Sequence, residues 1–205
     1  MSIKDSDRFF VITGPEGAGK TTLTQALERA GFDTVIESTR EVWRYQERIG
    51  GRYIAFSGGS QLDEMIYFEL SLAFDIRSYD QAAAKTGGPV IFDRGMLDII
   101  IFMRHLNLPV PDHIIKAVRL HPYNRTVFMA PFRADIYTQD PERVSTAEEA
   151  AAQEPLFKEI YAEFGYELLY LPTATVEERV RFVAEHVRLD QRVRSAVRQA
   201  LLDCS

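Results

Sequence analysis

A glycine-rich segment near the amino terminus constrains the fold more than any other part of the chain. Gly14 to Thr21 reads Gly-Pro-Glu-Gly-Ala-Gly-Lys-Thr and fits the pattern G-x-x-x-x-G-K-[ST] at every fixed position. In this pattern backbone N–H groups turn inward around an anion, the lysine reaches the β- and γ-phosphates, and the last hydroxyl binds Mg²⁺. The segment therefore predicts a nucleoside triphosphate site. The residues predicted to contact the nucleotide are Gly14, Pro15, Glu16, Gly17, Ala18, Gly19, Lys20, Thr21 and Thr22.

The residues on either side of this segment agree with a phosphate-binding loop. Residues 8–13 form a short, mostly apolar run, which predicts a buried strand. Apolar residues then recur with helical spacing between positions 20 and 30, and Gly31 ends that pattern. A strand, a loop and a helix follow one another in the order that such a loop requires. A glycine-rich turn without a ligand is therefore the weaker interpretation.

Further apolar runs predict the remaining elements of the chain. Strands are expected at residues 32–36, 90–92, 126–129 and 166–171. Helices are expected at residues 61–85, 97–106, 112–119, 145–164 with a break open at Pro155, and 175–187. A helix can also begin at residue 43, before a glycine-rich insertion. This alternation predicts a three-layer α/β/α fold with a five-stranded parallel sheet, right-handed crossovers and the first strand in the centre.

Length and composition favour one domain over residues 1–205, with a lid-like segment at 130–160 and an amphipathic tail at 188–205. No apolar run approaches the roughly 18 residues of a membrane-spanning helix, and Met1 to Asp7 does not resemble a signal peptide. We therefore expect a soluble, cytoplasmic protein. The net charge of −6 argues against a broad nucleic-acid surface. The single cysteine, Cys204, excludes a disulfide framework and a cysteine-based metal site.

Polar residues follow two of the predicted strands at the edge where α/β sheets bind their ligands. Asp93 comes directly after the apolar run 90–92 and is the predicted Mg²⁺ carboxylate, with Thr21 as the hydroxyl ligand. A carboxylate that caps the following turn is the alternative. Arg94 either holds a phosphate of the acceptor or pairs with Asp93 or Asp98. Both interpretations of Arg94 stay open.

The sequence resembles a known family in several of these motifs. They are Glu16 to Thr22, Glu37 after the second strand, Asp93-Arg94-Gly95 with Asp98, Arg143, Leu171-Pro172 and Glu178-Arg179-Val180. Together they resemble the small P-loop ATPase family, AAA-ATPase-like, that is related to the ribosylnicotinamide kinase domain. The similarity to thymidylate and deoxynucleoside kinases is more distant. The resemblance implies a P-loop NTPase fold of nucleoside or nucleotide kinase type.

The resemblance also implies roles for single residues. Glu37 resembles the strand-end glutamate with which deoxynucleoside kinases accept the proton of a hydroxyl. An ion pair of Glu37 with Arg40 or Arg94 is an equal alternative, and Glu41, one helical turn later, competes for the same role. Arg40 and Arg94 are the predicted acceptor-binding cations. Whether Glu37, Glu41 or Asp93 is the base stays open.

The polar segment after the fourth strand is the predicted lid. P-loop kinases carry arginines there that close over the transferring phosphoryl group. Arg143 matches the family position and is predicted to be catalytic, whereas Arg133 is interpreted as a solvated loop charge. Glu16 is given no catalytic role, because its side chain can point outward while its backbone faces the phosphates.

These features predict an enzyme that transfers the γ-phosphoryl group of ATP to a nucleoside, a nucleotide or a similar small acceptor, with Lys20, Glu37, Asp93 and Arg143 as catalytic residues. ATP is favoured over GTP because the chain lacks the Asn-Lys-x-Asp motif of GTPases. The predicted cofactors are ATP and Mg²⁺. A nucleotide-dependent binding switch or a slow NTPase that acts through a protein partner is the alternative. No nucleic-acid or membrane partner is expected, and a homodimer stays open.

Overall fold

A computed structural model of the chain describes residues 7–51, 60–134 and 146–203. Five strands form one parallel sheet in the order β2-β3-β1-β4-β5, so the strand that precedes the glycine-rich loop is central, as predicted. The strands are β1 (Phe9–Thr13), β2 (Asp33–Val35), β3 (Val90–Asp93), β4 (Thr126–Met129) and β5 (Glu167–Tyr170). The helices are α2 (Lys20–Arg29), α3 (Ser38–Ile49), α4 (Gln61–Ala84), α5 (Leu97–His105), α6 (Asp112–Leu120), α7 (Ala147–Ala152), α8 (Glu154–Glu163) and α9 (Val176–Asp203).

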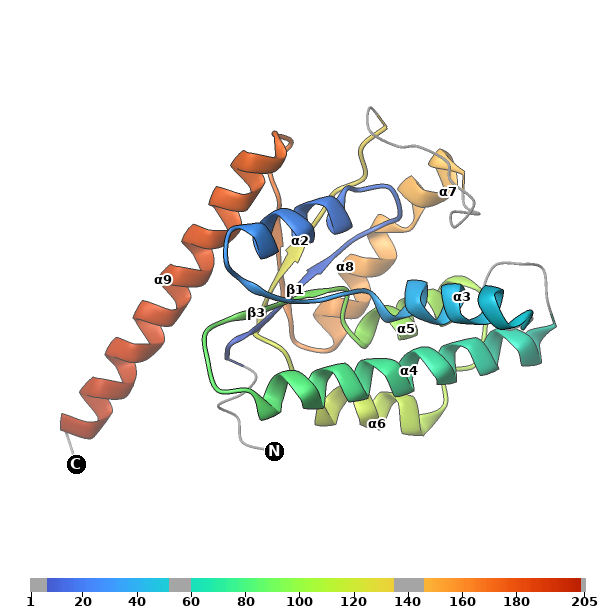
Figure 1. Ribbon diagram of the computed structural model, residues 1–205, viewed down its shortest axis with the longest axis horizontal. Coiled ribbons are helices and arrows are strands. Elements are labelled where there is room, and N and C mark those ends of the chain that lie inside the picture. Colours follow the sequence, from blue (N-terminus) through green and yellow to red (C-terminus); the bar gives the residue numbers. More distant parts are fainter. Residues whose placement is uncertain (1–6, 52–59, 135–145, 204–205) are drawn as a thin grey trace.

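Helices cover both faces of the sheet (Figure 1). Successive side chains of β1 point to opposite faces and all of them are buried, as expected for a central parallel strand. Phe10 and Ile12 pack with α2 and α9 on one face. Phe9 and Val11 pack with α4, α5, α6 and α8 on the other. The predicted three-layer α/β/α fold is therefore confirmed.

The largest difference from the predicted elements is the position of α3. The polar run after the second strand is already helical, and the helix begins at Ser38 rather than at residue 43. Ser38, Val42 and Gln46 recur every fourth residue and form its buried face, against which α4 packs (Figure 1). The predicted start of this helix at residue 43 was wrong because the buried stripe is only one residue wide and charged residues lie between its members.

Two smaller differences concern the later helices. The predicted helix at 145–164 is divided into α7 and α8, and Pro155 lies in the first turn of α8, where its missing N–H breaks no helical hydrogen bond. The two amphipathic segments after residue 175 form one continuous helix, α9. Residues 188–203 of the predicted tail are thus the far end of a helix that begins beside the sheet.

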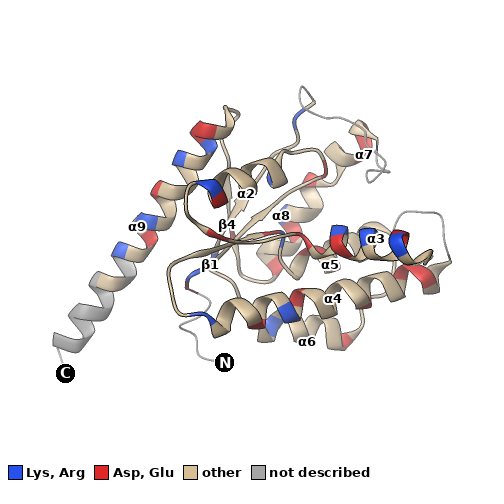
Figure 2. Ribbon diagram, viewed as in Figure 1, with Lys and Arg blue, Asp and Glu red and all other residues tan. Residues whose placement is uncertain are grey.

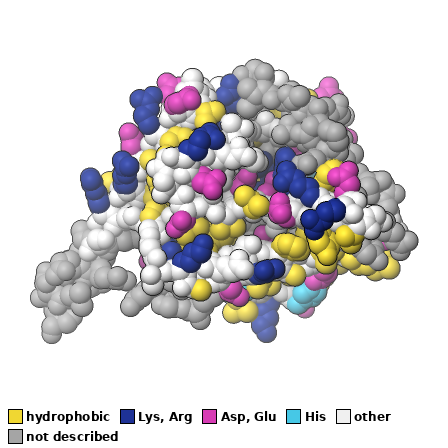
Figure 3. All heavy atoms as spheres, in the orientation of Figure 1, with side chains coloured by type: hydrophobic (Ala, Val, Ile, Leu, Met, Phe, Trp, Pro, Cys, Tyr) yellow, Lys and Arg dark blue, Asp and Glu magenta, His cyan; other side chains and the backbone are white. Residues whose placement is uncertain are grey.

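The described surface carries both signs of charge. Acidic and basic residues are mixed along α3 and along the coloured part of α9 (Figure 2), and they are interspersed on the face that Figure 3 shows. No helix within residues 7–51, 60–134 and 146–203 has the length and the apolar character that crossing a bilayer requires.

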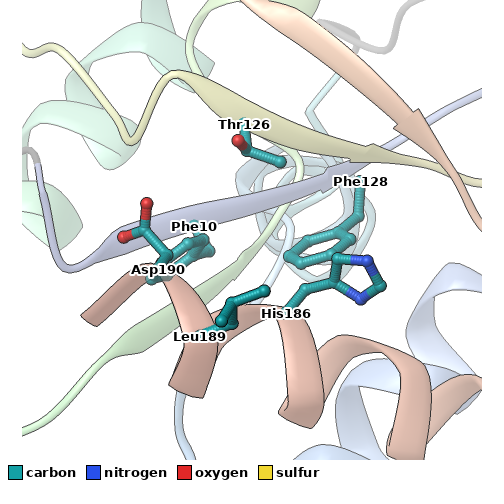
Figure 4. A pocket seen from close by; sticks show the side chains of 6 residues that line it. All are labelled: Phe10, Thr126, Phe128, His186, Leu189 and Asp190. Carbon is teal, nitrogen blue, oxygen red and sulfur yellow. The ribbon is translucent and has the colours of Figure 1, made fainter. Parts of the chain in front are cut away.

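A pocket of about 240 Å³ lies between the sheet and α9 (Figure 4). Its lining residues are Phe10, Thr126, Phe128, His186, Leu189 and Asp190. Phe10 and Thr126 lie at the amino-terminal ends of β1 and β4. Because α/β sheets bind their ligands at the carboxyl ends of the strands, this pocket is separate from the site described next.

Candidate functional site

The loop between β1 and α2 has the backbone of an anion cradle. Gly14, Gly17 and Gly19 have φ angles of 135°, 73° and 78°, in the region that favours glycine. A Cβ atom at Gly14 would also overlap the carbonyl oxygen of Ala130. Gly19 is the N-cap of α2, so the loop leads into a helix amino terminus, which favours negative charge. The predicted phosphate-binding residues thus occupy the geometry that their pattern implies.

Lys20, the first residue of α2, is buried and folds back over this loop. Its Nζ donates hydrogen bonds to the carbonyl oxygens of Gly14 (2.9 Å) and Pro15 (2.7 Å). Burial, helped by the charge of Arg94, lowers the pKa of Lys20 to about 7, although nearby carboxylates oppose this shift. Its ammonium therefore lies in a low-dielectric position where an anion would stabilise its charge strongly.

Arg94 links three elements beneath the loop. Its Nε donates to Glu37 Oε1 (2.8 Å), and its Nη1 donates to Gly14 O (2.9 Å) and Asp98 Oδ2 (2.9 Å). The guanidinium also lies over the ring of Phe102, 4.9 Å from its centroid. Burial opposes the charge of Arg94, but Glu37 and Asp98 raise its pKa above the ordinary value. Of its two predicted carboxylate partners, Asp98 forms the ion pair.

Asp98, in the first turn of α5, connects this network to the central strand and to α8. It is 2% exposed. Its carboxylate accepts hydrogen bonds from the hydroxyls of Thr13 (2.8 Å) and Tyr161 (2.6 Å) in addition to Arg94. The sequence predicts Asp98 as a partner of Arg94. The local sequence pattern contains no signal for the contacts of Asp98 with Thr13 and Tyr161.

Glu37 lies at the carboxyl end of β2 and faces the loop. Its carboxylate accepts hydrogen bonds from Arg94 Nε (2.8 Å), Arg40 Nε (3.2 Å) and the hydroxyl of Thr39 (2.6 Å). Burial alone would raise its pKa, but Arg94, Lys20 and Arg40 lower it to about 2. Both ion pairs that the sequence left open are therefore present, and Arg40 and Arg94 both hold Glu37.

Glu41, the competing carboxylate, lies in a different environment. It pairs with Arg44 at 3.3 Å on the outer side of α3, where the two side chains are 39% and 54% exposed. Glu37, by contrast, is 11% exposed and belongs to the buried network below the loop. The geometry therefore favours Glu37 over Glu41 as the candidate base.

Asp93 and Thr21 are close together beside the loop. Asp93 ends β3 and is 3% exposed, and the hydroxyl of Thr21 lies close to its carboxylate. Its buried Oδ1 has no hydrogen-bond partner within the described part of the chain. Burial and the charge of Glu37 raise its pKa to about 6. An unsatisfied carboxylate oxygen next to a hydroxyl fits a hard cation such as Mg²⁺.

The remaining ligands of such a cation would come from outside the described part of the chain. Across residues 7–51, 60–134 and 146–203, no three or more His, Cys, Asp or Glu residues form a group that could hold a metal. Mg²⁺ sites of nucleotide-binding enzymes commonly combine one or two protein oxygens with waters and phosphate oxygens. The Thr21 and Asp93 pair is compatible with that arrangement.

Glu16, inside the loop, does not point fully outward as the sequence analysis supposed. Its Oε2 is buried and has no hydrogen-bond partner among the described residues. Its side chain lies near Tyr67 of α4: burial, Glu37 and Glu16 together raise the pKa of the Tyr67 hydroxyl. That hydroxyl donates to Thr39 O at 2.7 Å. Glu16 therefore faces the side of the loop that α3 and α4 border.

The two predicted lid arginines have different outcomes. Arg143 lies outside the described residues, so its predicted role stays a prediction. Arg133 is not a solvated loop charge, because it is partly buried and its Nη1 donates to Ala174 O at 3.1 Å. This bond joins the segment after β4 to the segment before α9.

A second arginine joins α9 to the phosphate-binding loop. Arg179 is 3% exposed, and it donates to Pro172 O (2.9 Å) and to Ala18 O (3.1 Å). Arg179 belongs to the family motif Glu178-Arg179-Val180, and the sequence alone assigns it no role. Its contact with the loop places the start of α9 against the candidate site.

Asp75 of α4 is a further carboxylate that the sequence analysis missed. It is partly buried and lies close to the hydroxyl of Ser38. Burial raises its pKa to about 7, and the negative charges of Asp98 and Glu37 act in the same direction. Asp75 follows the buried Ser71 by four residues, and an acid on a buried helical stripe is a signal that sequence reasoning could have used.

We expect Asp75→Asn to stabilise the protein at pH 8 and to have little effect at pH 4. At pH values between the ordinary pKa of 3.8 and the raised pKa of about 7, Asp75 is protonated in the folded state but ionised in the unfolded state. The stability of the native sequence therefore falls as the pH rises through that window. The gain at pH 8 is at most about 4 kcal/mol, since one pKa unit corresponds to about 1.4 kcal/mol.

Urea unfolding at pH 4, 6 and 8 measures this effect. Asp33→Asn is the control, because Asp33 is exposed on β2. The environment assigned to Asp75 is wrong if both variants differ from the native sequence by the same amount at every pH.

Comparisons with known proteins agree with this geometry at the level of the fold. A family model described as "AAA domain" matches residues 9–179. No curated protein matches the chain. Among solved structures, deoxyadenosine kinase from M. mycoides with dCMP and dCDP bound is 16% identical to this chain and has a TM-score of 0.63. The match includes 88% of this chain and 98% of the kinase chain.

Two further structures share the fold. NadR in complex with NR is 19% identical to this chain and has a TM-score of 0.64. The match includes 87% of this chain but only 50% of NadR, so this chain spans about half the length of NadR. Thymidylate kinase from Candida albicans is 12% identical to this chain and has a TM-score of 0.58. The match includes 90% of this chain and 92% of the thymidylate kinase chain. The resemblance predicted from the motifs is confirmed. Since the family model matches from β1 into α9, the chain belongs to this AAA-domain family of P-loop proteins.

Proposed function

We propose that the protein is an ATP-dependent phosphotransferase that moves the γ-phosphoryl group to a nucleoside, a nucleotide or a similar small acceptor. The observation that carries this proposal is the buried network in which Arg94 joins the phosphate-binding loop to the strand-end carboxylate Glu37. A loop that only holds a nucleotide needs no carboxylate beneath it. The ligands bound in the deoxyadenosine kinase structure, dCMP and dCDP, and in the NadR structure, NR, support the same chemistry.

In this proposal the loop and Lys20 bind the phosphates. The inward-turned backbone N–H groups would hold the phosphate oxygens, and the Lys20 ammonium would exchange its carbonyl partners for the β- and γ-phosphates. Because Lys20 is buried, its charge would act on the transferring group with little screening. Thr21 and Asp93 would hold Mg²⁺, which when bound neutralises charge on the phosphate oxygens.

Glu37 would orient the acceptor. Its low pKa makes it a weak base but keeps it ionised at neutral pH. Phosphoryl transfer passes through a loose transition state in most analyses, so orienting the attacking oxygen matters more than early removal of its proton. Arg94 and Arg40 would fix the carboxylate in place. Asp93 stays an alternative group for the same role.

The test is a panel of acceptors incubated with Mg·ATP. We expect ADP release well above the rate without acceptor, together with a phosphorylated product detected by mass spectrometry. ADP release that no acceptor accelerates would identify a slow NTPase instead. Nucleotide binding with no turnover across the panel would support a switch that acts through a protein partner. Either result would overturn the proposed transfer.

A further inference from the structure

The described cations on the acceptor side of the loop are already paired within the protein. Arg94 holds Glu37, Asp98 and a loop carbonyl, and Arg40 holds Glu37. A phosphate on the acceptor carries about two negative charges and needs such donors. To bind Arg94 it would have to displace a buried carboxylate, and a buried charge without its partner is strongly destabilising. The remaining cation, Lys20, lies at the loop itself.

Two carboxylates near Glu37 have no cationic partner among the described residues. Glu16 extends from the loop toward Tyr67, and its buried Oε2 has no hydrogen-bond partner within the described residues. Asp75 lies close to the neutral hydroxyl of Ser38 at the start of α3. These groups would repel an acceptor phosphate, and Mg·ATP would add further negative charge beside them.

The unsatisfied oxygen of Glu16 indicates what this space would bind instead. A buried carboxylate oxygen without a donor is costly, and a ligand that supplies an O–H or N–H group removes that cost. Glu16 lies in the loop that holds the phosphates, so a ligand bound to it is next to the γ-phosphate. Glu37 approaches the same space from the end of β2, where it can contact a second hydroxyl of the ligand.

We propose, on the basis of the phosphotransfer proposed above, that the acceptor carries no phosphate. It is a neutral or cationic compound with several hydroxyl or amine groups, such as a nucleoside, and Glu16 binds one donor group while a different hydroxyl reacts. The oxygen of that hydroxyl forms a bond to the γ-phosphorus, and the bond from the γ-phosphorus to the β,γ-bridging oxygen breaks. ADP leaves with that electron pair, and the hydroxyl proton passes to Glu37 or to water.

The first experiment compares matched acceptor pairs. Adenosine, cytidine, their deoxy forms and nicotinamide riboside are each tested against the corresponding 5′-monophosphate with Mg·ATP. We expect kcat/KM to be higher for the nucleoside by about tenfold or more, because like charges brought together cost several kcal/mol. Equal or faster turnover of the monophosphates would overturn this inference and leave the phosphotransferase intact. No turnover of either member of any pair would overturn both.

The second experiment tests Glu16 itself. Glu16→Gln keeps the shape of the side chain and removes its charge, so the KM for the acceptor is expected to rise about tenfold while the KM for ATP stays within about twofold. Glu47→Gln is the control, because Glu47 is exposed on α3. Stabilisation by Mg·ATP in a thermal melt shows that the variant is folded and binds nucleotide. An equal rise in both KM values, or no rise for the acceptor, would contradict the role given to Glu16.

Discussion

Replacing Lys20 by alanine is expected to lower kcat for acceptor-dependent ADP release about 100- to 1,000-fold, the loss seen when one buried donor to a developing charge is removed. Lys20 is 6% exposed, so water does not screen its ammonium. Its hydrogen bonds in the structure go to two loop carbonyls, and neither joins one secondary-structure element to another. The variant is therefore expected to fold.

Steady-state kinetics with a saturating acceptor, together with circular dichroism, measures this loss. Lys116→Ala is the matched control, because Lys116 is exposed on α6, away from the loop. A Lys20→Ala protein that binds Mg·ATP and turns over acceptor as fast as the native protein would show that the loop is not the site of transfer.

Replacing Arg94 by methionine is expected to lower the free energy of unfolding by about 3–5 kcal/mol, the range found when one partner of a buried ion pair is removed. Methionine fills much of the space but leaves Glu37 and Asp98 as buried carboxylates without their shared cation. It also removes the hydrogen bond to Gly14 O, which ties the network to the loop.

Urea unfolding measures this loss, and Arg125→Met is its control. Arg125 pairs with Glu167 at 2.8 Å, but those side chains are 69% and 66% exposed, so that pair is worth about 0–1 kcal/mol. Adding Asp98→Asn to Arg94→Met should cost less than the sum of the single changes, because the two residues share one interaction. A loss below about 1 kcal/mol for Arg94→Met would mean that water or other groups compensate for the missing cation.

The sequence predicted the sheet and the loop because both depend on short local patterns. The apolar runs of β1 and β3 and the spacing of Gly14, Gly19 and Lys20 are visible without knowledge of the fold. The carboxyl ends of parallel strands meet at one edge, which explains why Asp93 and Arg94 could be assigned to the site.

The network below the loop was less accessible to prediction. Tyr161 meets Asp98 across 63 positions of the sequence, through a hydrogen bond between α8 and α5. Such contacts depend on how helices pack around the sheet, and no local pattern encodes that packing. Glu16 is a similar case, because only the position of α4 determines which side of the loop its carboxylate faces.

The backbone of Arg94 has a consequence for which residues can replace it. Its φ angle of 68° is left-handed, a conformation that costs a residue with a Cβ atom about 1–2 kcal/mol. Glycine would relieve that cost but would remove the guanidinium, and lysine would keep the charge but lose the planar fork that reaches several acceptors at once. The left-handed main chain at position 94 therefore favours glycine, whereas the side-chain contacts require arginine. Natural variants of this protein are expected to keep arginine there.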